Sequence, residues 1–258
     1  MQSIKNEVIW VTGASSGIGQ ALAIHLSQLG NQVVISGRNA ALLDQMAQDY
    51  SGMIPLAFDV VDPIQIARAR ETLHAQFSYI DRVILNAGTC EYLDIQAPDW
   101  TLFSRTFNVN LNGPVNCLEM ALPLLKAAKA PHIVGVASLA SIAPFPRAEA
   151  YGASKAAFDY LLESLRLDVK GLGIDVSVIL PGFVDTPLTQ KNDFEMPFQI
   201  TATEAAMRMA EAIADRKQRF IFPKRLYWSI RLLHAVPGLW QRLMTPKTTV
   251  STDDGATR

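Results

Sequence analysis

Near the start of the chain stands Thr12-Gly13-Ala14-Ser15-Ser16-Gly17-Ile18-Gly19, between a continuous apolar run and an amphipathic pattern. The apolar run Val8–Val11 predicts a buried strand, and Ile18–Leu29 has the periodicity of a helix. The three glycines between them allow a tight turn and a close approach of the backbone to a bound diphosphate. The N-terminus of the following helix offers free N–H groups and a positive dipole end to phosphates. The stretch therefore predicts a nucleotide-binding loop, and it lacks the Gly-Lys-Ser/Thr ending of a nucleoside-triphosphate loop.

Short β-rich runs alternate with longer helical patterns up to residue 223, as they do in βαβ units on a parallel sheet. The predicted strands are Val8–Val11, Gln32–Ser36, Met53–Phe58, Arg82–Leu85, His132–Ala137, Asp175–Leu180 and Phe220–Phe222. The predicted helices include Ile18–Leu29, Ala40–Gln48, Ile64–Phe77 and Ala148–Lys170. Several of the strand runs are apolar throughout, which is typical of strands covered on both faces. This order predicts an α/β fold of the Rossmann type, a doubly wound parallel sheet of about seven strands flanked by helices.

The chain has 258 residues, 49% of them hydrophobic, which suits one large core. We expect a single domain over residues 1–223 and a C-terminal extension over residues 224–258. The extension reads as two short amphipathic helices separated by Pro237-Gly238, followed by a polar tail from Thr245. No internal repeat or low-complexity linker interrupts the first 223 residues.

Bulk composition excludes several classes of function. A net charge of −1 argues against a general nucleic-acid binder. The two cysteines, Cys90 and Cys117, are too far apart in sequence for a paired metal-ligand motif, so we expect neither a disulfide framework nor a metal site. The apolar run at Val8 begins too soon after Met1 for a signal peptide, and no uninterrupted run of 18 apolar residues occurs. The expected location is the cytoplasm.

The glycine motif, with its Gly-x3-Gly-x-Gly spacing, resembles the cofactor motif of the short-chain dehydrogenase/reductase family, and further motifs follow in the family's order. Asn86-Ala87-Gly88 is similar to the family's NAG motif, and Asn110 falls where the family has its catalytic Asn. Ser138 stands thirteen residues before Tyr151, which opens the Tyr-x3-Lys pair with Lys155. Pro181-Gly182 with Thr186 resembles the stretch that closes over the nicotinamide. The resemblance covers roughly residues 5–223 and implies an NAD(P)-dependent oxidoreductase that acts on CH–OH groups and the corresponding carbonyls.

The resemblance also implies roles for four catalytic residues. Tyr151 would exchange a proton with the substrate oxygen, and Lys155, four residues later on the same helix face, would lower the pKa of the phenol. Ser138 would hold and polarise the substrate oxygen, and Asn110 would support the proton relay. Ser141 is a weaker alternative to Ser138. Asn108 and Asn112 have the same chemistry as Asn110, which is chosen by spacing alone.

Cofactor preference is expected from the end of the second strand. An acidic residue usually stands there in NAD-binding members of this fold, whereas here Gly37 is followed by Arg38. A guanidinium can pair with a 2′-phosphate, so we expect NADP to be preferred over NAD. The residues expected to bind the cofactor are Gly13, Ser15, Ser16, Gly17, Ile18, Gly19, Arg38, Asp59, Val60, Asn86, Ala87, Gly88, Tyr151, Lys155, Pro181, Gly182, Val184 and Thr186.

The segments expected to border the substrate are apolar: Ile142–Pro146, and Phe194, Met196 and Phe198. They favour a hydrophobic ketone, aldehyde or secondary alcohol, because they offer no anion-binding cluster apart from Arg147. A homodimer or homotetramer is the expected assembly.

Charge is unevenly distributed along the chain. Residues 216–247 hold eight of the 23 Lys and Arg and no Asp or Glu, which leaves 15 basic against 24 acidic residues elsewhere. Two interpretations of residues 224–244 stay open. The segment either contacts anionic lipid or covers a lipophilic substrate, or it packs on the protein's own core or on a second subunit.

Two further function classes compete with an enzyme. One is a cofactor-binding regulator that has lost catalysis; the joint presence of Ser138, Tyr151 and Lys155 argues against it, because such a protein has no chemical need of all three. The other is a peripheral membrane scaffold built on residues 224–258, which vesicle binding with and without that segment would separate.

Overall fold

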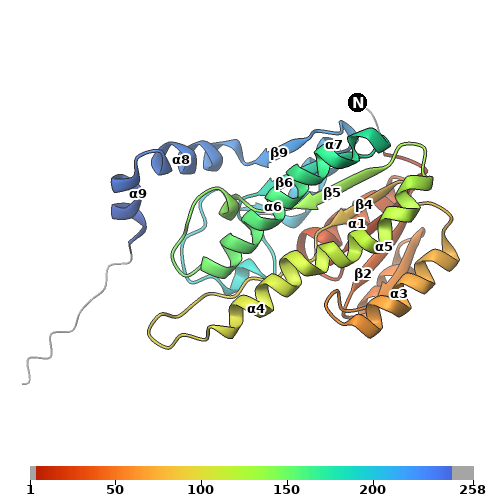
Figure 1. The fold of residues 1–258 in the computed structure, drawn as a ribbon, viewed down its shortest axis with the longest axis horizontal. Helices are drawn as coiled ribbons and strands as arrows, with labels where there is room; N and C mark the ends of the chain where they lie inside the picture. The colour runs from red at the N-terminus through yellow and green to blue at the C-terminus, as the bar shows by residue number, and fades with distance from the viewer. Residues whose placement is uncertain (1–3, 246–258) are drawn as a thin grey trace, which may run out of the picture.

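One parallel sheet organises the protein, for which the computed structural model describes residues 4–245. Seven strands form it in the order β3-β2-β1-β4-β5-β6-β9 (Figure 1). Their bounds are β1 Val8–Thr12, β2 Gln32–Gly37, β3 Met53–Ala57, β4 Arg82–Leu85, β5 His132–Val136, β6 Asp175–Pro181 and β9 Arg219–Phe222. The strand order runs outward from β1 in both directions, so the predicted Rossmann-type fold is confirmed.

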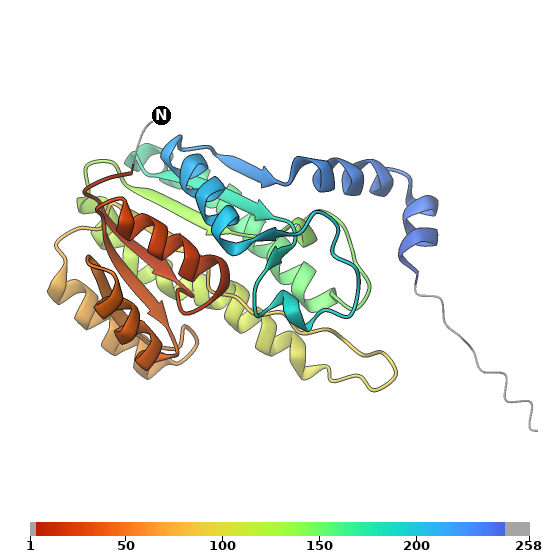
Figure 2. The same ribbon diagram turned by 180° about the vertical axis from the view of Figure 1, so that it is seen from behind.

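Helices cover both faces of the sheet, and each layer has its own core (Figures 1 and 2). On one face lie α1 (Gly17–Gln28), α2 (Ala40–Asp49) and α7 (Ala202–Ala214). On the other lie α3 (Pro63–Gln76), α5 (Gly113–Ala127) and α6 (Glu149–Val169). The five residues of β1 are all buried, and Trp10 has no exposed surface. This explains why the strand runs are apolar throughout and do not alternate.

Local signals fix where these helices start. Asp62 caps α3 by accepting from the backbone N–H groups of Ile64 and Gln65, and Pro63 occupies the first helical position. Thr201 caps α7 in the same way through the N–H of Glu204. Both caps place a helix directly after a strand or a strand-end turn, so the helix returns across the sheet.

Two parts of the architecture were not expected from the sequence. A second, two-stranded parallel pair joins β7 (Val184–Asp185) to β8 (Ile200–Thr201). The helix α4 (Thr101–Phe107) passes through a π-helical turn, η1 (Asn108–Asn112), straight into α5. Short 3₁₀ turns lie at η2 (Leu139–Ser141), η3 (Lys170–Leu172) and η4 (Thr189–Lys191).

Beyond β9 the chain forms α8 (Lys224–His234) and α9 (Pro237–Met244), which stand beyond the end of the sheet in Figure 1. Both helices fall inside the segment expected to form the C-terminal extension. Most of the expected polar tail, residues 246–258, lies outside the described residues. Within residues 4–245 no helix combines the length and the apolar character that a membrane span requires.

A buried polar network ties together the amino ends of three central strands. The Arg82 guanidinium donates to both carboxylate oxygens of Glu7 at 3.0 Å. It also contacts Nδ1 of His132, whose Nε2 lies 2.7 Å from the Ser177 hydroxyl. Arg82 is 2% exposed and His132 is fully buried. Burial, together with the Arg82 charge, holds the pKa of His132 well below its usual range.

Stability is therefore expected to fall as the solution becomes mildly acidic. An unfolded His takes up a proton near pH 6.5, whereas the folded His132 does not, so the unfolded state binds more protons below that pH. Each proton adds a slope of about 1.4 kcal/mol per pH unit. Urea unfolding at pH 7.5 and 5.5 should show this loss in the wild type and a smaller loss in His132→Gln. The partly exposed His25 supplies the control, His25→Gln, and a control as flat as His132→Gln would contradict the assignment.

Candidate active site

The glycine-rich loop follows β1 and leads into α1, as the sequence predicts. Gly13 and Gly17 adopt left-handed φ values of 67° and 55°. A Cβ added to Gly13 would lie 2.7 Å from the Cα of Ala87, so only glycine allows this approach of two loops. Ser16 precedes the first turn of α1 without a side-chain cap. The free N–H groups of that turn suit a phosphate group.

Thr12 holds the loop after β1 against the loop after β4. Its hydroxyl accepts from the backbone N–H of Asn86 at 3.0 Å and of Ala87 at 3.1 Å. In return the Asn86 amide donates to the carbonyls of Thr12 and Gly13 at 3.1 and 3.2 Å. The sequence analysis did not assign Thr12 a role, although it directly precedes Gly13.

Asn110 occupies the centre of the π-helical turn and is fully buried. Its amide nitrogen donates at 2.9 Å to the Thr89 carbonyl and to the Ser154 hydroxyl, and its oxygen accepts from the Thr89 N–H at 2.8 Å. Asn108 and Asn112 are exposed and hydrogen-bond each other at 2.9 Å. Of the three asparagines, Asn110 is therefore the one that the fold turns toward the ends of the central strands. π-Helical turns occur often at functional sites.

Ser138, Tyr151 and Lys155 come together where β5 ends and α6 begins. The Ser138 hydroxyl accepts from the backbone N–H of Ala140 at 3.1 Å and acts on the Tyr151 phenol, whose pKa it lowers. Ser141, the weaker alternative, donates to the Ser138 carbonyl at 2.7 Å. The Lys155 amine is buried, donates to the Val136 carbonyl at 2.9 Å and lies 3.3 Å from where a Cβ on Gly88 would be. The Asn110 oxygen lies at that same distance, so Gly88 sits between the two side chains.

The protein shifts both titratable groups toward their neutral forms. Burial raises the pKa of Tyr151 to about 12, and the hydrogen bond with Ser138 opposes this shift. Burial lowers the pKa of Lys155 to about 8. The sequence predicts that Lys155 lowers the pKa of the phenol. In the structure the Lys155 amine donates to the Val136 carbonyl and Ser138 opposes the rise in the pKa of Tyr151, so the role of Lys155 stays a prediction.

Cys90, Tyr92 and Ser154 lie near this centre, and no role was expected for them from the sequence. Cys90 follows the NAG segment and hydrogen-bonds Tyr92; burial raises the pKa of its thiol to about 11. Ser154 is fully buried and receives a hydrogen bond from Asn110. Ser154 lies inside the Tyr-x3-Lys pair, one turn from Tyr151, which is the only sequence signal that could have pointed to it.

A cluster of side chains joins the loop after β4 to the segment after β7. The Tyr92 hydroxyl donates to the Asn192 side-chain oxygen at 2.7 Å, and its ring packs edge-on to Phe194. Arg147 forms a two-oxygen ion pair with Asp193 at 2.8 and 2.9 Å and lies over the Tyr92 ring. The sequence left Arg147 as a lone candidate for binding an anionic substrate. In the structure, Arg147 forms an ion pair with Asp193.

The expected cofactor residues at the edge of the sheet lie around the glycine loop. A Cβ on Gly37 would come within 2.9 Å of the Ser15 hydroxyl, and the exposed Arg38 follows directly. A Cβ on Gly17 would come within 3.0 Å of the Thr186 methyl group, so the stretch after β6 meets the loop from the other side. Val60 is buried and Asp59 partly buried where β3 ends.

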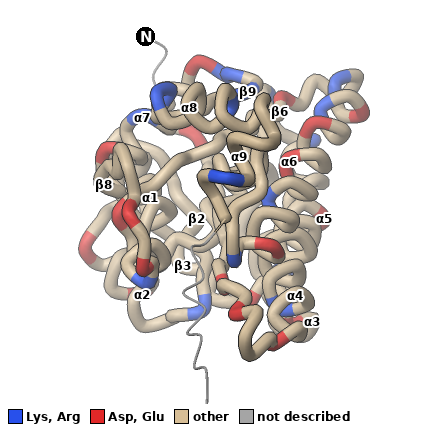
Figure 3. The backbone as a smooth tube through the Cα atoms, turned by 90° about the vertical axis from the view of Figure 1, so that its left-hand side faces the viewer, with Lys and Arg blue, Asp and Glu red and all other residues tan. Residues whose placement is uncertain are grey.

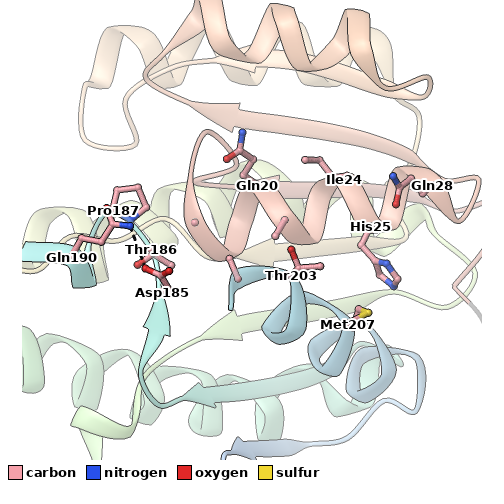
Figure 4. A pocket seen from close by; sticks show the side chains of 13 residues that line it. Gln20, Ile24, His25, Gln28, Asp185, Thr186, Pro187, Gln190, Thr203 and Met207 are labelled. Atoms are coloured by element: carbon pink, nitrogen blue, oxygen red, sulfur yellow. Dashed lines mark hydrogen bonds between the residues drawn. The ribbon is translucent and has the colours of Figure 1, made fainter. Parts of the chain in front are cut away.

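A groove of about 580 Å³ opens beside this loop, between α1 and the segment 185–207 (Figure 4). Gly17 and Thr186 line it at one end, and His25 and Met207 line it further along α1 and α7. Figure 4 shows Asp185 and Gln190, which hydrogen-bond each other at 3.2 Å, at the end near Thr186. Ser138, Tyr151 and Lys155 are not among the lining residues, so the groove is separate from the catalytic centre.

The amino-acid sequence is similar to those of known proteins. The profile of the family described as short chain dehydrogenase matches residues 7–196. The chain belongs to the short-chain dehydrogenase family. An uncharacterised oxidoreductase of Myxococcus xanthus is 33% identical over 232 residues, covering 88% of this chain and 92% of that protein. Dehydrogenase/reductase SDR family member 7B of Mus musculus is 28% identical, covering 95% of this chain and 82% of that protein.

Solved structures of other short-chain dehydrogenases have the same fold. One from Burkholderia cenocepacia, in complex with NADP, has a TM-score of 0.82 at 26% identity, covering 95% of this chain and all of that one. One from Burkholderia phymatum, in complex with NAD, also has a TM-score of 0.82, at 24% identity and 96% coverage of this chain. The protein is thus an oxidoreductase of a family whose members bind NAD or NADP. The residues of the glycine loop fit such a dinucleotide, because a side chain at Gly13 or Gly17 would fill the close approach that the loop keeps open.

No group of three His, Cys, Asp or Glu in residues 4–245 is arranged to hold a metal ion.

The Thr12 hydroxyl should prove important for both stability and dinucleotide binding. Thr12→Val keeps the volume but leaves the N–H groups of Asn86 and Ala87 without their acceptor, at a cost of about 1–3 kcal/mol for such a group. Urea unfolding should show that loss, and fluorescence titration with a nicotinamide dinucleotide should show weaker binding. Thr106→Val is the matched control, since the Thr106 hydroxyl is buried without a hydrogen-bond partner in the described part of the chain. Equal stabilities of the two variants would refute the role of Thr12.

Proposed function

We propose that the protein is an NADP-dependent oxidoreductase that interconverts a hydrophobic carbonyl compound and the corresponding secondary alcohol. The observation that supports this most is the meeting of Ser138, Tyr151, Lys155 and Asn110 at the carboxyl ends of β4 and β5. A nicotinamide cofactor supplies the hydride for the carbonyl carbon. The chain must then bind the substrate oxygen and provide or remove one proton.

The four side chains divide that work. Ser138 hydrogen-bonds the substrate oxygen and holds it against the Tyr151 hydroxyl, whose pKa Ser138 lowers. Tyr151 donates its proton to that oxygen in reduction and accepts it back in oxidation. Lys155, with a pKa of about 8, carries a positive charge over much of the neutral range and favours the phenolate that reduction leaves behind. Asn110 ties the loop at Thr89 to Ser154 of α6, so that the lysine and the tyrosine of that helix keep their places.

The preference for NADP rests on Arg38 and on the absence of a carboxylate at Gly37. An acid at the end of β2 would repel a 2′-phosphate, whereas the exposed guanidinium of Arg38 can pair with it through two hydrogen bonds. Arg38 forms no ion pair within residues 4–245, so pairing with a phosphate breaks no existing contact there.

The preference for an apolar substrate rests on the side chains around the catalytic centre. Phe183 and Tyr92 both pack edge-on to Phe194, and Arg147, which lies over the Tyr92 ring, is paired with Asp193. An anionic substrate would therefore meet aromatic rings and a neutralised arginine. A cytoplasmic location and a homodimeric or homotetrameric assembly remain predictions made from the sequence.

Removing the phenol hydroxyl should abolish turnover while leaving the dinucleotide site intact. Tyr151→Phe is expected to lower kcat by 10²–10⁴-fold, about the usual contribution of general acid–base catalysis, with little change in the Kd for NADPH. Steady-state kinetics with a panel of ketones and aldehydes of increasing chain length measures both this loss and the preferred substrate. Tyr160→Phe removes a hydroxyl from an exposed site on the same helix and should keep wild-type activity. A Tyr151→Phe variant with more than about a tenth of wild-type kcat contradicts the mechanism.

Cofactor choice should depend on one arginine. Fluorescence titration is expected to give at least about tenfold tighter binding of NADPH than of NADH, as expected from a charge-assisted contact of about 1.5–3 kcal/mol. Arg38→Ala should erase most of that difference by weakening NADPH alone. Arg68→Ala, an exposed arginine on α3, should leave both dissociation constants unchanged. Equal affinity of the wild type for the two dinucleotides would refute the preference.

A further inference from the structure

The two C-terminal helices expose a row of large apolar side chains. Each residue of this row, which we call the α8–α9 apolar row, follows the previous one by three or four positions. Its members are Trp228, Leu232, Val236, Leu239 and Leu243, and all are exposed, from 41% for Leu239 to 66% for Leu232. Trp228 and Leu232 therefore share one face of α8, Leu239 and Leu243 share one face of α9, and Val236 lies between the two helices. Soluble surfaces rarely concentrate large apolar side chains without a binding role.

Other side chains of the same helices are firmly anchored. Leu226 and Ile230 of α8 are buried in the core, and Leu226 lies so near Gly182 that a Cβ there would approach its methyl group to 2.8 Å. Trp240 of α9 is buried, donates its indole N–H to the Pro144 carbonyl at 3.0 Å and packs edge-on to Phe145. Loose attachment of the helices is therefore not the reason why the row is exposed. The row remains uncovered after α8 and α9 have buried these other side chains.

Positive charges surround this row. In α8, Lys224 and Arg225 precede Trp228 by four and three positions, and Arg231 follows it by three, so all three cations neighbour Trp228 on the helix surface. Arg242 lies three positions after Leu239 on α9. All four cations are exposed, none pairs with a carboxylate within residues 4–245, and residues 224–245 contain no Asp or Glu.

We propose that the α8–α9 apolar row, with its surrounding cations, docks the protein on an anionic phospholipid membrane. The apolar side chains insert shallowly at the level of the acyl chains nearest the surface, and the arginines and lysine lie among the phosphate and carboxylate headgroups. Trp228 suits that position, because an indole ring places an apolar body in the lipid and a polar N–H in the interface.

Charge complementarity favours lipid over a second copy of the chain. A symmetric contact between two copies would bring the same patch against itself and would set Lys224, Arg225 and Arg231 opposite like charges, with no carboxylate in the segment to offset them. An anionic membrane supplies the opposite charge over the whole surface. Residues 224–245 hold four Lys and Arg and no Asp or Glu, so the docking segment itself is cationic.

The docking surface lies at the end of the molecule that holds the catalytic centre. Trp240 binds the segment around Pro144, which separates Ser138 from Tyr151, and Leu226 packs beside Gly182. Figure 3 shows α9 in front of the sheet in the view from the side where α8 and α9 extend. On the proposed function, membrane docking would bring apolar carbonyl compounds dissolved in the lipid close to Ser138 and Tyr151. The docking itself does not depend on turnover.

Co-sedimentation of the full chain with phospholipid vesicles tests the proposal. The wild type should bind phosphatidylcholine vesicles in which about a third of the lipid is phosphatidylserine, bind pure phosphatidylcholine more weakly, and be released by about 1 M salt, which screens the charges. Arg225→Gln/Arg231→Gln should bind anionic vesicles about thirtyfold more weakly, given the contribution of each near-surface cation. Trp228→Ser/Leu232→Ser should bind at least about tenfold more weakly through the lost apolar burial.

Matched variants separate docking from general surface effects. Leu167→Ser removes an apolar side chain that is 76% exposed on α6, and Lys129→Gln removes an exposed cation away from the segment; both should bind vesicles as the wild type does. Trp228→Phe keeps an apolar ring and should retain binding. Thermal unfolding and reduction of a water-soluble ketone, measured on the same samples, should be unchanged in all variants, so loss of docking and loss of the proposed activity are seen separately.

Three results would overturn the proposal. The first is no wild-type binding to anionic vesicles at low salt. The second is equal binding to anionic and neutral vesicles, or binding by the two double variants that matches the wild type. The third is a dimer on size-exclusion chromatography that Trp228→Ser/Leu232→Ser dissociates without any vesicle binding, which would assign the surface to a second copy.

Discussion

The close approach of the loops after β1 and β4 is the constraint on which the rest of the site depends. The Thr12 hydroxyl accepts two backbone N–H groups from the second loop, and Asn86 returns two hydrogen bonds to the first. A glycine at position 13 is required because the two backbones come within van der Waals contact there. The loop after β4 then places Gly88 between Lys155 and Asn110. The dinucleotide loop and the catalytic centre are therefore positioned by one set of contacts, and a change at Thr12 should affect both.

The environment of Tyr151 and Lys155 favours the neutral form of each side chain more than water does. Burial raises the pKa of Tyr151 and lowers that of Lys155, each disfavouring the charged form. Forming the tyrosinate therefore needs help from a nearby positive charge, which both the lysine and an oxidised nicotinamide can supply. The Ser138 hydrogen bond already acts in that direction. On the proposed function, a bound oxidised nicotinamide would favour the ionisation of the phenol, which burial alone opposes.

The sequence was sufficient for the sheet and for the positions of the motif residues. Both follow from local patterns: apolar strand runs, glycine spacing, and the Tyr151–Lys155 pair on one helix face. It did not reveal the Tyr92–Asn192 hydrogen bond or the Arg147–Asp193 ion pair, which join residues 100 and 46 positions apart. It also did not reveal that the turn around Asn110 is π-helical. What fails to appear in a single sequence is contact between segments far apart in the chain, such as these two contacts with the segment after β7.

The amino and carboxyl ends of the parallel strands serve different purposes. At the amino ends, Arg82, Glu7 and His132 form a buried polar network whose partners are satisfied within the protein. At the carboxyl ends, Gly13, Gly88 and the first turn of α1 leave backbone groups open toward the space where ligands bind in this fold. The α8–α9 apolar row also lies at the carboxyl end, because α8 and α9 extend from the carboxyl end of β9. Because internal hydrogen bonds satisfy the polar groups at the amino ends of the strands, acidification should act there on stability. Substrate, cofactor and membrane would all meet the protein at the carboxyl ends.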